Sequence, residues 1–463
     1  MSESVKNKKI LVVGLGKSGI AAFTVLFVKG ALLSVYDDRD IEKDDPELFM
    51  KLRGSSASLY LKGEISDKEP WDMIVLSPGV PPTLPFIENA KKCGIKVIGE
   101  VELAYILGQG RYAAVTGTNG KTTTTTLIGE IFTAAGLKTI VAGNIGTPVV
   151  SKAVSADAET WLVTEVSSFQ LESIEKFRPK IAVFLNLTPD HIDRHKSMES
   201  YAEAKARIFE NQSEDDVLIF NADDELVSSL AERASARKLP FSRKKTLSAG
   251  AYVCDGMLVF KATENEDPVA IIRTDELRIP GAHNLENALA AAAAAFAAGV
   301  SLSITADVLK SFKGVDNRIE FVAEHDGIRF VNDSKGTNPD AAIKAIEAIS
   351  ADGKILLIAG GYDKDSDFSE FVREAKGKVK KFLLLGATAE KIKNAALNEG
   401  FSEKDIIMTE GMTEAVRIGF ELADDGDTVL LSPACASWDM YENFEERGAH
   451  FREAVAELET GKW

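Results

Sequence analysis

The stretch Ala114–Thr126, "AVTGTNGKTTTTT", follows an apolar run and leads directly into a helical pattern. Its glycines allow backbone N–H groups to approach phosphate, and Lys121 can reach the β- and γ-phosphates of a nucleotide. The Thr122 hydroxyl can ligate Mg²⁺, while the helix N-terminus favours negative charge. Val115 stands at the first glycine position of the GxxxxGK[ST] pattern, so the match is imperfect. We nevertheless expect a strand, loop and helix of the P-loop type that binds ATP or GTP.

Apolar runs alternate with helical patterns on both sides of this loop, which predicts an α/β protein. A chain of 463 residues has room for about three domains of roughly 150 residues. The first set of strands ends near Gly99, and a new set begins near Gly314. We expect a Rossmann-like domain over 1–100, a central P-loop-type ATP-binding domain over 101–314 and a Rossmann-like C-terminal domain over 315–463.

Composition limits the partners of the chain. The formal net charge of −17 repels nucleic acid and anionic lipid, so local cations and backbone amides must bind any anionic ligand. Three scattered cysteines favour a reduced compartment over a disulfide framework or zinc site. The N-terminal stretch lacks the ~7–15 residue apolar core of a signal peptide. The longest run of small apolar residues, 288–299, is shorter than the ~20 residues of a membrane span. We expect a soluble, cytoplasmic protein with no nucleic-acid or membrane partner.

A second glycine-rich turn, "GLGKSG" at 14–19, also follows an apolar run. Its GxGxxG spacing, with Asp37 and Asp38 closing the next strand, is typical of a dinucleotide site such as that for NAD. A full dinucleotide domain needs a second half, however, and this chain continues straight to the triphosphate loop. Because a helix N-terminus binds any pyrophosphate, the turn can hold a different nucleotide.

Carboxylates and histidines suited to metal follow two later strands. Glu165 ends the strand "WLVTE", at the edge of the sheet where ligands bind, and suits Mg²⁺. In "DHIDRH", His191 is a candidate Mg²⁺ ligand. His191 and His195 have the spacing of a zinc-protease helix, but Ile192 occupies the position of its glutamate base, which argues against proteolysis. Lys205 lies in a helical pattern that by itself indicates only a surface lysine.

Taken together, several motifs resemble those of the Mur ligases along the whole chain. They are GTNGKTTT, EVSSFQLE, DHIDRH, YAEAKARIF, GAHNLENALAA, NDSKGTNP and SPACASWDMYENFEERG. The resemblance implies an ATP-dependent amide ligase that adds D-glutamate to UDP-N-acetylmuramoyl-L-alanine through an acyl phosphate, in peptidoglycan synthesis. We expect it to be a monomer. A ligase of the same family that adds another amino acid is an alternative, as is a nucleotide-binding protein without turnover. Lys335 and Thr337 favour D-glutamate, and the pairing of Lys121 with Glu165 favours an enzyme.

The resemblance also implies that the first domain binds the UDP-sugar and not NAD. The implied contacts lie on the glycine turn, at the ends of two later strands and on the central domain. They are Gly14, Leu15, Gly16, Lys17, Ser18, Asp37, Asp38, Arg39, Ser77, Pro78, Gly79, Asn144 and Gln170.

For ATP, the resemblance implies contacts from the phosphate loop and from later motifs. They are Gly117, Thr118, Asn119, Gly120, Lys121, Thr122, Thr123, Asn284, Asn287, Arg318 and Asp333. It implies two Mg²⁺ ions held by Thr122, Glu165, His191 and Lys205, the last as a carbamate that turns the cation into an anion. Lys121, Glu165, His191 and Lys205 are the implied catalytic residues.

D-Glutamate is implied to bind the third domain. The implied contacts are Lys335, Thr337, Lys364, Ser437 and the backbone of Phe444. Two positions depart from the family pattern: Asn317 stands where relatives often have histidine, and Tyr362 where an acid is expected.

Overall fold

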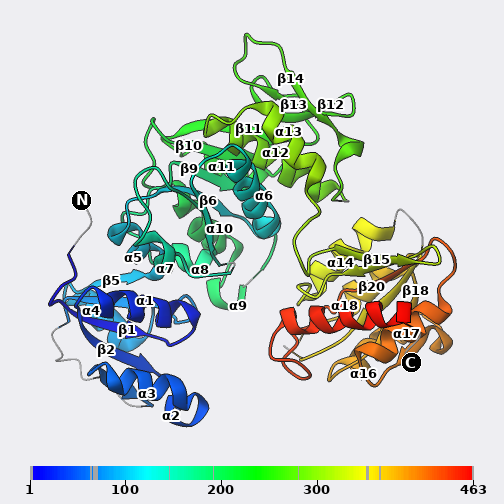
Figure 1. Ribbon diagram of the computed structural model, residues 1–463, viewed down its shortest axis with the longest axis horizontal. Helices are drawn as coiled ribbons and strands as arrows, with labels where there is room; N and C mark the ends of the chain where they lie inside the picture. Colours follow the sequence, from blue (N-terminus) through cyan, green and yellow to red (C-terminus); the bar gives the residue numbers. More distant parts are fainter. Residues whose placement is uncertain are drawn as a thin grey trace. The chain divides into compact units, whose positions relative to one another are not determined.

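A computed structural model describes residues 4–62, 65, 71–144, 146–190, 192–279, 281–350, 354–363 and 366–460. It contains a five-stranded, a nine-stranded and a six-stranded sheet, each with helices packed beside it (Figure 1). The predicted α/β architecture is therefore confirmed. The chain forms two compact units, Met1–Glu276 with Leu285–Lys310, and Leu277–Asn284 with Ser311–Trp463. The first unit holds two of the sheets and the second unit holds the third.

The N-terminal sheet is parallel and has the strand order β3-β2-β1-β4-β5. Its strands are β1 (Lys9–Val13), β2 (Leu32–Asp37), β3 (Ser58–Leu61), β4 (Met73–Leu76) and β5 (Lys96–Gly99). Its helices are α1 (Lys17–Val28), α2 (Ile41–Asp44), α3 (Pro46–Gly54), α4 (Pro85–Lys92) and α5 (Glu100–Leu107). The strand order reverses between β1 and β4, which creates a crevice at their carboxyl ends, where ligands bind in such sheets.

The central sheet has the order β14-β13-β12-β11-β10-β9-β6-β8-β7, parallel from β7 to β12 and antiparallel beyond. Its strands are β6 (Arg111–Thr116), β7 (Thr139–Gly143), β8 (Trp161–Glu165), β9 (Ile181–Phe184), β10 (Val217–Asn221), β11 (Arg237–Ser242), β12 (Gly250–Cys254), β13 (Met257–Lys261) and β14 (Val269–Arg273). The helices of this region are α6 (Lys121–Ala134), α7 (Val149–Ala153), α8 (Ser168–Leu171), α9 (Ile192–His195), α10 (Met198–Ala206), η1 (Arg207–Phe209), α11 (Glu225–Ala231), η2 (Thr274–Glu276), α12 (Ala282–Ala297) and α13 (Leu302–Ser311). Val115 of β6 pairs with Glu165 of β8, so the phosphate loop and this carboxylate share one edge of the sheet.

A single hydrophobic core joins these two sheets. It runs from Ile10 and Leu26 through Val101 of α5 to Tyr112 of β6. Tyr105, Tyr112 and Phe177 pack together, with ring centroids 5.2–5.8 Å apart. The shared core explains why the two sheets belong to one compact unit.

The C-terminal sheet has the order β15-β16-β20-β17-β18-β19, with only the β15–β16 pair antiparallel. Its strands are β15 (Glu320–His325), β16 (Ile328–Asn332), β17 (Ile355–Ala359), β18 (Val379–Leu384), β19 (Ile406–Met408) and β20 (Thr428–Leu431). Its helices are α14 (Pro339–Ile349), α15 (Ser369–Ala375), α16 (Ala389–Asn398), η4 (Glu403–Asp405), α17 (Met412–Leu422) and α18 (Phe444–Thr460). Leu357 packs in the core under α14–α16, and its neighbours Leu356 and Ile358 pack under α17 and α18. This alternation buries both faces of the sheet. None of the helices in the described ranges is long and apolar enough to cross a membrane.

Candidate functional site

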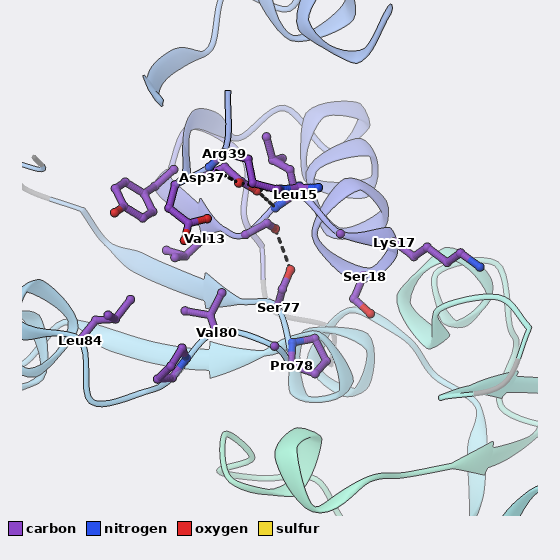
Figure 2. A pocket seen from close by; sticks show the side chains of 16 residues that line it. Val13, Leu15, Lys17, Ser18, Asp37, Arg39, Ser77, Pro78, Val80 and Leu84 are labelled. Atoms are coloured by element: carbon purple, nitrogen blue, oxygen red, sulfur yellow. Dashed lines mark hydrogen bonds and ion pairs between the residues drawn. The ribbon is translucent and has the colours of Figure 1, made fainter. Parts of the chain in front are cut away.

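A cavity of about 550 Å³ opens at the carboxyl ends of β1 and β4 (Figure 2). It brings together all the N-terminal residues that the sequence predicts to contact the UDP-sugar. The lining residues are Val13, Gly14, Leu15, Gly16, Lys17, Ser18, Tyr36, Asp37, Asp38, Arg39, Ser77, Pro78, Gly79, Val80, Pro81 and Leu84. The cavity mouth includes the start of α1, where Gly16 caps the helix without a side-chain hydrogen bond. First-turn amides and Lys17 therefore offer this cavity a site for an anion.

Asp37 and Ser77 fix the shape of the glycine turn. Asp37 accepts hydrogen bonds from the Leu15 N–H at 2.6 Å and from the Arg39 side chain at 2.9 Å (Figure 2). Burial raises the pKa of Asp37, but the hydrogen bonds from Arg39 and Leu15 outweigh it and hold that pKa below its usual value. The Ser77 hydroxyl donates to the Gly14 carbonyl at 2.7 Å. The cavity thus contains an ionised carboxylate, that of Asp37, and a glycine turn that hydrogen bonds hold in place.

Asn144 and Gln170 do not line this cavity. Asn144 donates through Nδ2 to Glu165 Oε1 at 3.0 Å, beside the phosphate loop. Gln170 is buried, and its Oε1 accepts from the Ser167 N–H at 2.9 Å in a capping box at the start of α8. Both side chains belong to the central sheet and its helices.

The phosphate loop lies between β6 and α6. Gly120 has φ 82°, and a Cβ there would lie 2.2 Å from Asn287 Oδ1. Only glycine fits this turn without strain. Lys121 Nζ donates to the carbonyls of Gly117 at 3.0 Å and Thr118 at 2.8 Å. The loop therefore closes tightly enough to surround a phosphate group with its backbone amides.

Glu165 organises the edge of the sheet beside the loop. The Thr122 hydroxyl donates to its Oε2 at 2.8 Å, and Asn144 occupies its Oε1. The side chain is buried, with 3% of its surface exposed. A carboxylate and a threonine hydroxyl are the hard oxygen donors that Mg²⁺ prefers, so this pair fits the predicted metal.

Lys205 is buried, and the surface position that its helical pattern alone indicated is wrong. The residue is 2% exposed, its Nζ donates to the Gly117 carbonyl at 2.7 Å, and it lies 4.7 Å from the Tyr201 ring centroid. Burial and the charge of nearby Lys121 place the pKa of Lys205 well below its usual value. A neutral lysine amine is the form that reacts with CO₂, so the position suits carbamylation.

The remaining predicted metal ligand, His191, lies outside the described residues. In the part of the chain that the structure describes, no three His, Cys, Asp or Glu side chains cluster to hold a metal ion. Thr122, Glu165 and Lys205 nevertheless gather around the Gly117 loop.

Two of the predicted ATP contacts, Asn287 and Asn284, belong to different units. Asn287 Oδ1 accepts from the Thr124 hydroxyl at 3.1 Å and abuts Gly120 in the first unit. Asn284 is buried in the second unit.

Arg318 and Asp333 also lie in the second unit. Asp333 accepts hydrogen bonds from the Ser432 hydroxyl at 2.7 Å and the Ile319 N–H at 3.3 Å, and burial raises its pKa to about 7. Arg318 Nε is buried and has no hydrogen-bond partner among the residues that the structure describes. A buried unpaired donor is costly, which makes this guanidinium suited to an anionic ligand.

The predicted D-glutamate contacts gather on two loops of the second unit. Lys335 Nζ lies 5.5 Å from the Phe444 ring centroid, and the Phe444 carbonyl accepts from the Ser334 hydroxyl at 2.8 Å. Thr337 N–H donates to the Lys335 carbonyl at 2.9 Å, and Ser437 is buried. Lys364 lies outside the described residues.

Sequence reasoning missed the residue that joins these loops. Arg447 is buried, and its guanidinium donates to the Ser334 hydroxyl and carbonyl and to the carbonyls of Cys435 and Ala436, at 2.8–3.2 Å. Burial lowers its pKa to about 10. The only sequence signal is an arginine inside "FEERG", where charged neighbours give it the pattern of a surface residue.

The two departures from the family pattern have different environments. Asn317 is buried at φ 62°, and its Oδ1 accepts from Asn332 at 3.0 Å and Arg452 at 3.2 Å. Tyr362 is exposed and lies 5.6 Å from the Trp438 ring centroid. Asn317 is thus a structural link between β15, β16 and α18, while Tyr362 is a surface residue beside Ser437.

Comparison with known proteins finds similarity along nearly the whole chain. Family models match residues 8–99 ("Mur ligase MurD-like, N-terminal domain"), 115–295 ("Mur ligase middle domain") and 317–435 ("Mur ligase, glutamate ligase domain"). The "UDP-N-acetylmuramoylalanine--D-glutamate ligase" of Caldanaerobacter subterraneus subsp. tengcongensis is 49% identical over 98% of this chain and 99% of its own length.

Solved structures show the same fold at lower identity. MurC from Thermotoga maritima, a UDP-N-acetylmuramate-alanine ligase, has a TM-score of 0.60 at 19% identity and covers 98% of this chain and 100% of its own. MurF from the same organism, in complex with ADP, has a TM-score of 0.59 at 16% identity, over 99% and 98% of the two chains. At identities of 16–19%, the similarity to these structures supports a common fold only.

Proposed function

This chain belongs to the Mur ligase family, and from that premise we propose that it joins D-glutamate to UDP-N-acetylmuramoyl-L-alanine with the hydrolysis of ATP. The observation that carries the proposal is the 49% identity, over 98% of the chain, to a ligase named for that reaction. The product is a precursor of peptidoglycan. The three cysteines form no disulfide, which favours the cytoplasm, and we propose that the enzyme acts there as a monomer.

The UDP portion of the substrate binds the N-terminal cavity. The first-turn amides of α1 and Lys17 bind its diphosphate, and the wall formed by Asp37 and Arg39 binds the uridine. Asn144 and Gln170 contact the sugar from the central sheet. Support for this assignment comes from the cavity, which collects eleven of the thirteen predicted contacts, and from its position where the strand order reverses.

The phosphate loop binds ATP and prepares the first chemical step. A carboxylate does not react with an amine at neutral pH, because oxide is its leaving group. The alanine carboxylate therefore attacks the γ-phosphorus and forms an acyl phosphate with release of ADP. Two anions approach each other in this step, so Lys121 and the amides of Gly117–Gly120 must neutralise the phosphate oxygens and align them.

Thr122, Glu165, His191 and a carbamylated Lys205 are the residues that would hold Mg²⁺. When bound, Mg²⁺ supplies further neutralisation of the phosphate oxygens. Lys205 supports this role by its burial and lowered pKa, since both favour the neutral amine that takes up CO₂. Arg318 and Asp333 complete the nucleotide contacts, together with Asn284 and Asn287.

D-Glutamate binds Lys335, Thr337, Lys364, Ser437 and the Phe444 backbone. Its neutral amine attacks the carbonyl carbon of the acyl phosphate and forms a tetrahedral oxyanion. The oxyanion collapses with loss of inorganic phosphate, which carries away one oxygen of the original carboxylate. The amide bond forms, and the amine loses its proton to solvent.

The test measures phosphate release from ATP with UDP-N-acetylmuramoyl-L-alanine while the amino acid is varied. We expect release that depends on D-glutamate, and transfer of ¹⁸O from a labelled alanine carboxylate to the phosphate. Release that depends instead on L-alanine or a diamino acid would assign the chain to another step of the family. No release with any amino acid would indicate a binding protein, and unlabelled phosphate would refute the acyl phosphate.

A further inference from the structure

Arg194 of α9 donates hydrogen bonds to the wall of the N-terminal cavity. Its NH1 donates to the carbonyls of Pro78 at 3.1 Å and Gly79 at 3.3 Å, and its NH2 donates to that of Val80 at 3.4 Å. Pro78, Gly79 and Val80 all line the cavity, on the loop that follows β4 (Figure 2). Arg194 itself is not a lining residue. One side chain from the central region thus holds three successive carbonyls of the cavity wall.

The other contacts of Arg194 anchor it to α8. Its NH2 donates to Glu172 Oε2 at 2.8 Å, and its guanidinium lies 4.2 Å from the Phe169 ring centroid. Only 18% of the Arg194 side chain and 19% of the Glu172 side chain are exposed. His195 strengthens the anchor, because its Nδ1 lies 3.3 Å from Glu172 Oε1 and its ring stacks on Phe169. Gln170, a proposed sugar contact, lies between these two anchors in the chain.

The geometry of these contacts requires arginine. A guanidinium carries five N–H donors in a rigid plane, whereas a lysine ammonium is a compact point charge. The contacts also set the orientation of the loop backbone. In a trans peptide the N–H lies opposite the carbonyl, so holding the Pro78 carbonyl on Arg194 directs the Gly79 N–H to the other side of the loop.

We propose that Arg194 is a positioning residue for the nucleoside diphosphate sugar. It fixes the Pro78–Val80 wall relative to α8, so that the N-terminal cavity and the central contacts bind one ligand together. This inference rests on the proposed function, because it takes the cavity as the UDP site. Neither the phosphate loop nor Glu165 contacts Arg194 through any hydrogen bond found among the described residues, so ATP binding is expected to be independent of it.

The test compares Arg194→Ala and Arg194→Lys with Arg233→Ala. Arg233 is a matched control, because it also pairs with a glutamate, Glu203, but on an exposed surface. We expect Arg194→Ala to raise the Kd for UDP and the KM for the UDP-sugar by about tenfold or more. Arg194→Lys should fall between it and wild type, and Arg233→Ala should match wild type. The KM for ATP should change by less than about twofold in all three variants.

The outcomes separate positioning from misfolding and from a wrong function. Unchanged UDP affinity in both Arg194 variants would overturn the inference. A parallel loss of UDP affinity, ATP affinity and thermal stability would overturn it as well, because that pattern marks a folding defect. If Arg194→Ala does not fold, the affinities of Arg194→Lys for UDP and ATP are compared with those of wild type instead. If wild-type protein binds UDP but releases no phosphate with D-glutamate, the proposed function is refuted. The comparison of UDP affinity between wild type and the Arg194 variants would still test the role of Arg194.

Discussion

Lys205 and Lys121 donate to the same carbonyl oxygen, that of Gly117. Two cations so close together repel each other, and burial of Lys205 adds to the cost of its charge. Conversion of Lys205 to a carbamate would replace this repulsion by an attraction to Lys121. Because burial and Lys121 both disfavour the ammonium form of Lys205, this residue is suited to carbamylation.

Replacement of Lys205 by alanine should lower the rate of D-glutamate-dependent phosphate release by ~10²-fold or more, because a group that would hold Mg²⁺ near the phosphates is lost. Added short-chain carboxylic acids should restore part of the rate in Lys205→Ala but not in wild type. Lys205→Arg, which places a guanidinium charge there and cannot form the carbamate, should not be rescued. Wild-type activity in Lys205→Ala would show that no carbamate is needed.

Motif residues and packed residues differ in how far the sequence predicts them. Lys121 and Glu165 could be found because each follows an apolar strand, and strand ends mark the ligand edge of a parallel sheet. Lys205 and Arg447 are buried cations and Arg194 is a half-buried one, and their helices have the composition of surface helices. Their partners are carbonyl oxygens brought close only by the tertiary fold, and no local pattern in the sequence encodes such partners.

At the scale of elements, the fold was predictable where strands are buried on both faces. The run "ILLIA" of β17 and the run "WLVTE" of β8 are fully buried, and such short apolar runs are typical of parallel strands. The strand order was not predictable, because β6 pairs with both β8 and β9 through contacts distant in sequence. The N-terminal cavity depends on strand order in the same way, because it lies at the ends of β1 and β4, which are adjacent in the sheet but distant in sequence.

The junction of the phosphate loop with α6 gives a prediction about backbone geometry. In Gly120→Ala, φ of 82° and a Cβ only 2.2 Å from Asn287 Oδ1 should displace the loop from α12. We expect ATP affinity to fall at least ~10-fold and unfolding to occur at lower temperature. Gly136→Ala is the control, since φ there is 76° but no atom lies within 4 Å of the added Cβ. Calorimetric titration with ATP should separate the two, and equal losses would show that strain alone is responsible.

At the scale of the whole molecule, stability should depend on buried acids in the core that joins the first two sheets. Glu100 accepts the Val150 N–H at 2.6 Å, while its buried Oε2 has no partner in the described part of the chain. Burial raises the pKa of Glu100 from 4.5 to about 7. The folded protein therefore holds this proton more tightly than the unfolded chain does, and the associated stability is complete below about 4.5 and lost as the pH rises through about 7.

Thermal unfolding between these two pH values should test the role of Glu100. Wild type should lose stability as the pH rises, and Glu100→Gln should lose less, because the glutamine cannot ionise. Glu159→Gln, a change on the exposed surface, should follow wild type. Identical pH profiles for Glu100→Gln and wild type would show that the carboxyl is not the group responsible.

The core that runs without a break from Ile10 through Val101 to Tyr112 has a consequence for how this protein can be divided. A gene fragment cut after Gly99 would expose the apolar side of α1 that α5 and α7 cover. The N-terminal sheet and its cavity are consequently not a separable module: they could not be transplanted onto another scaffold, or inherited separately, without the central sheet that completes their hydrophobic core.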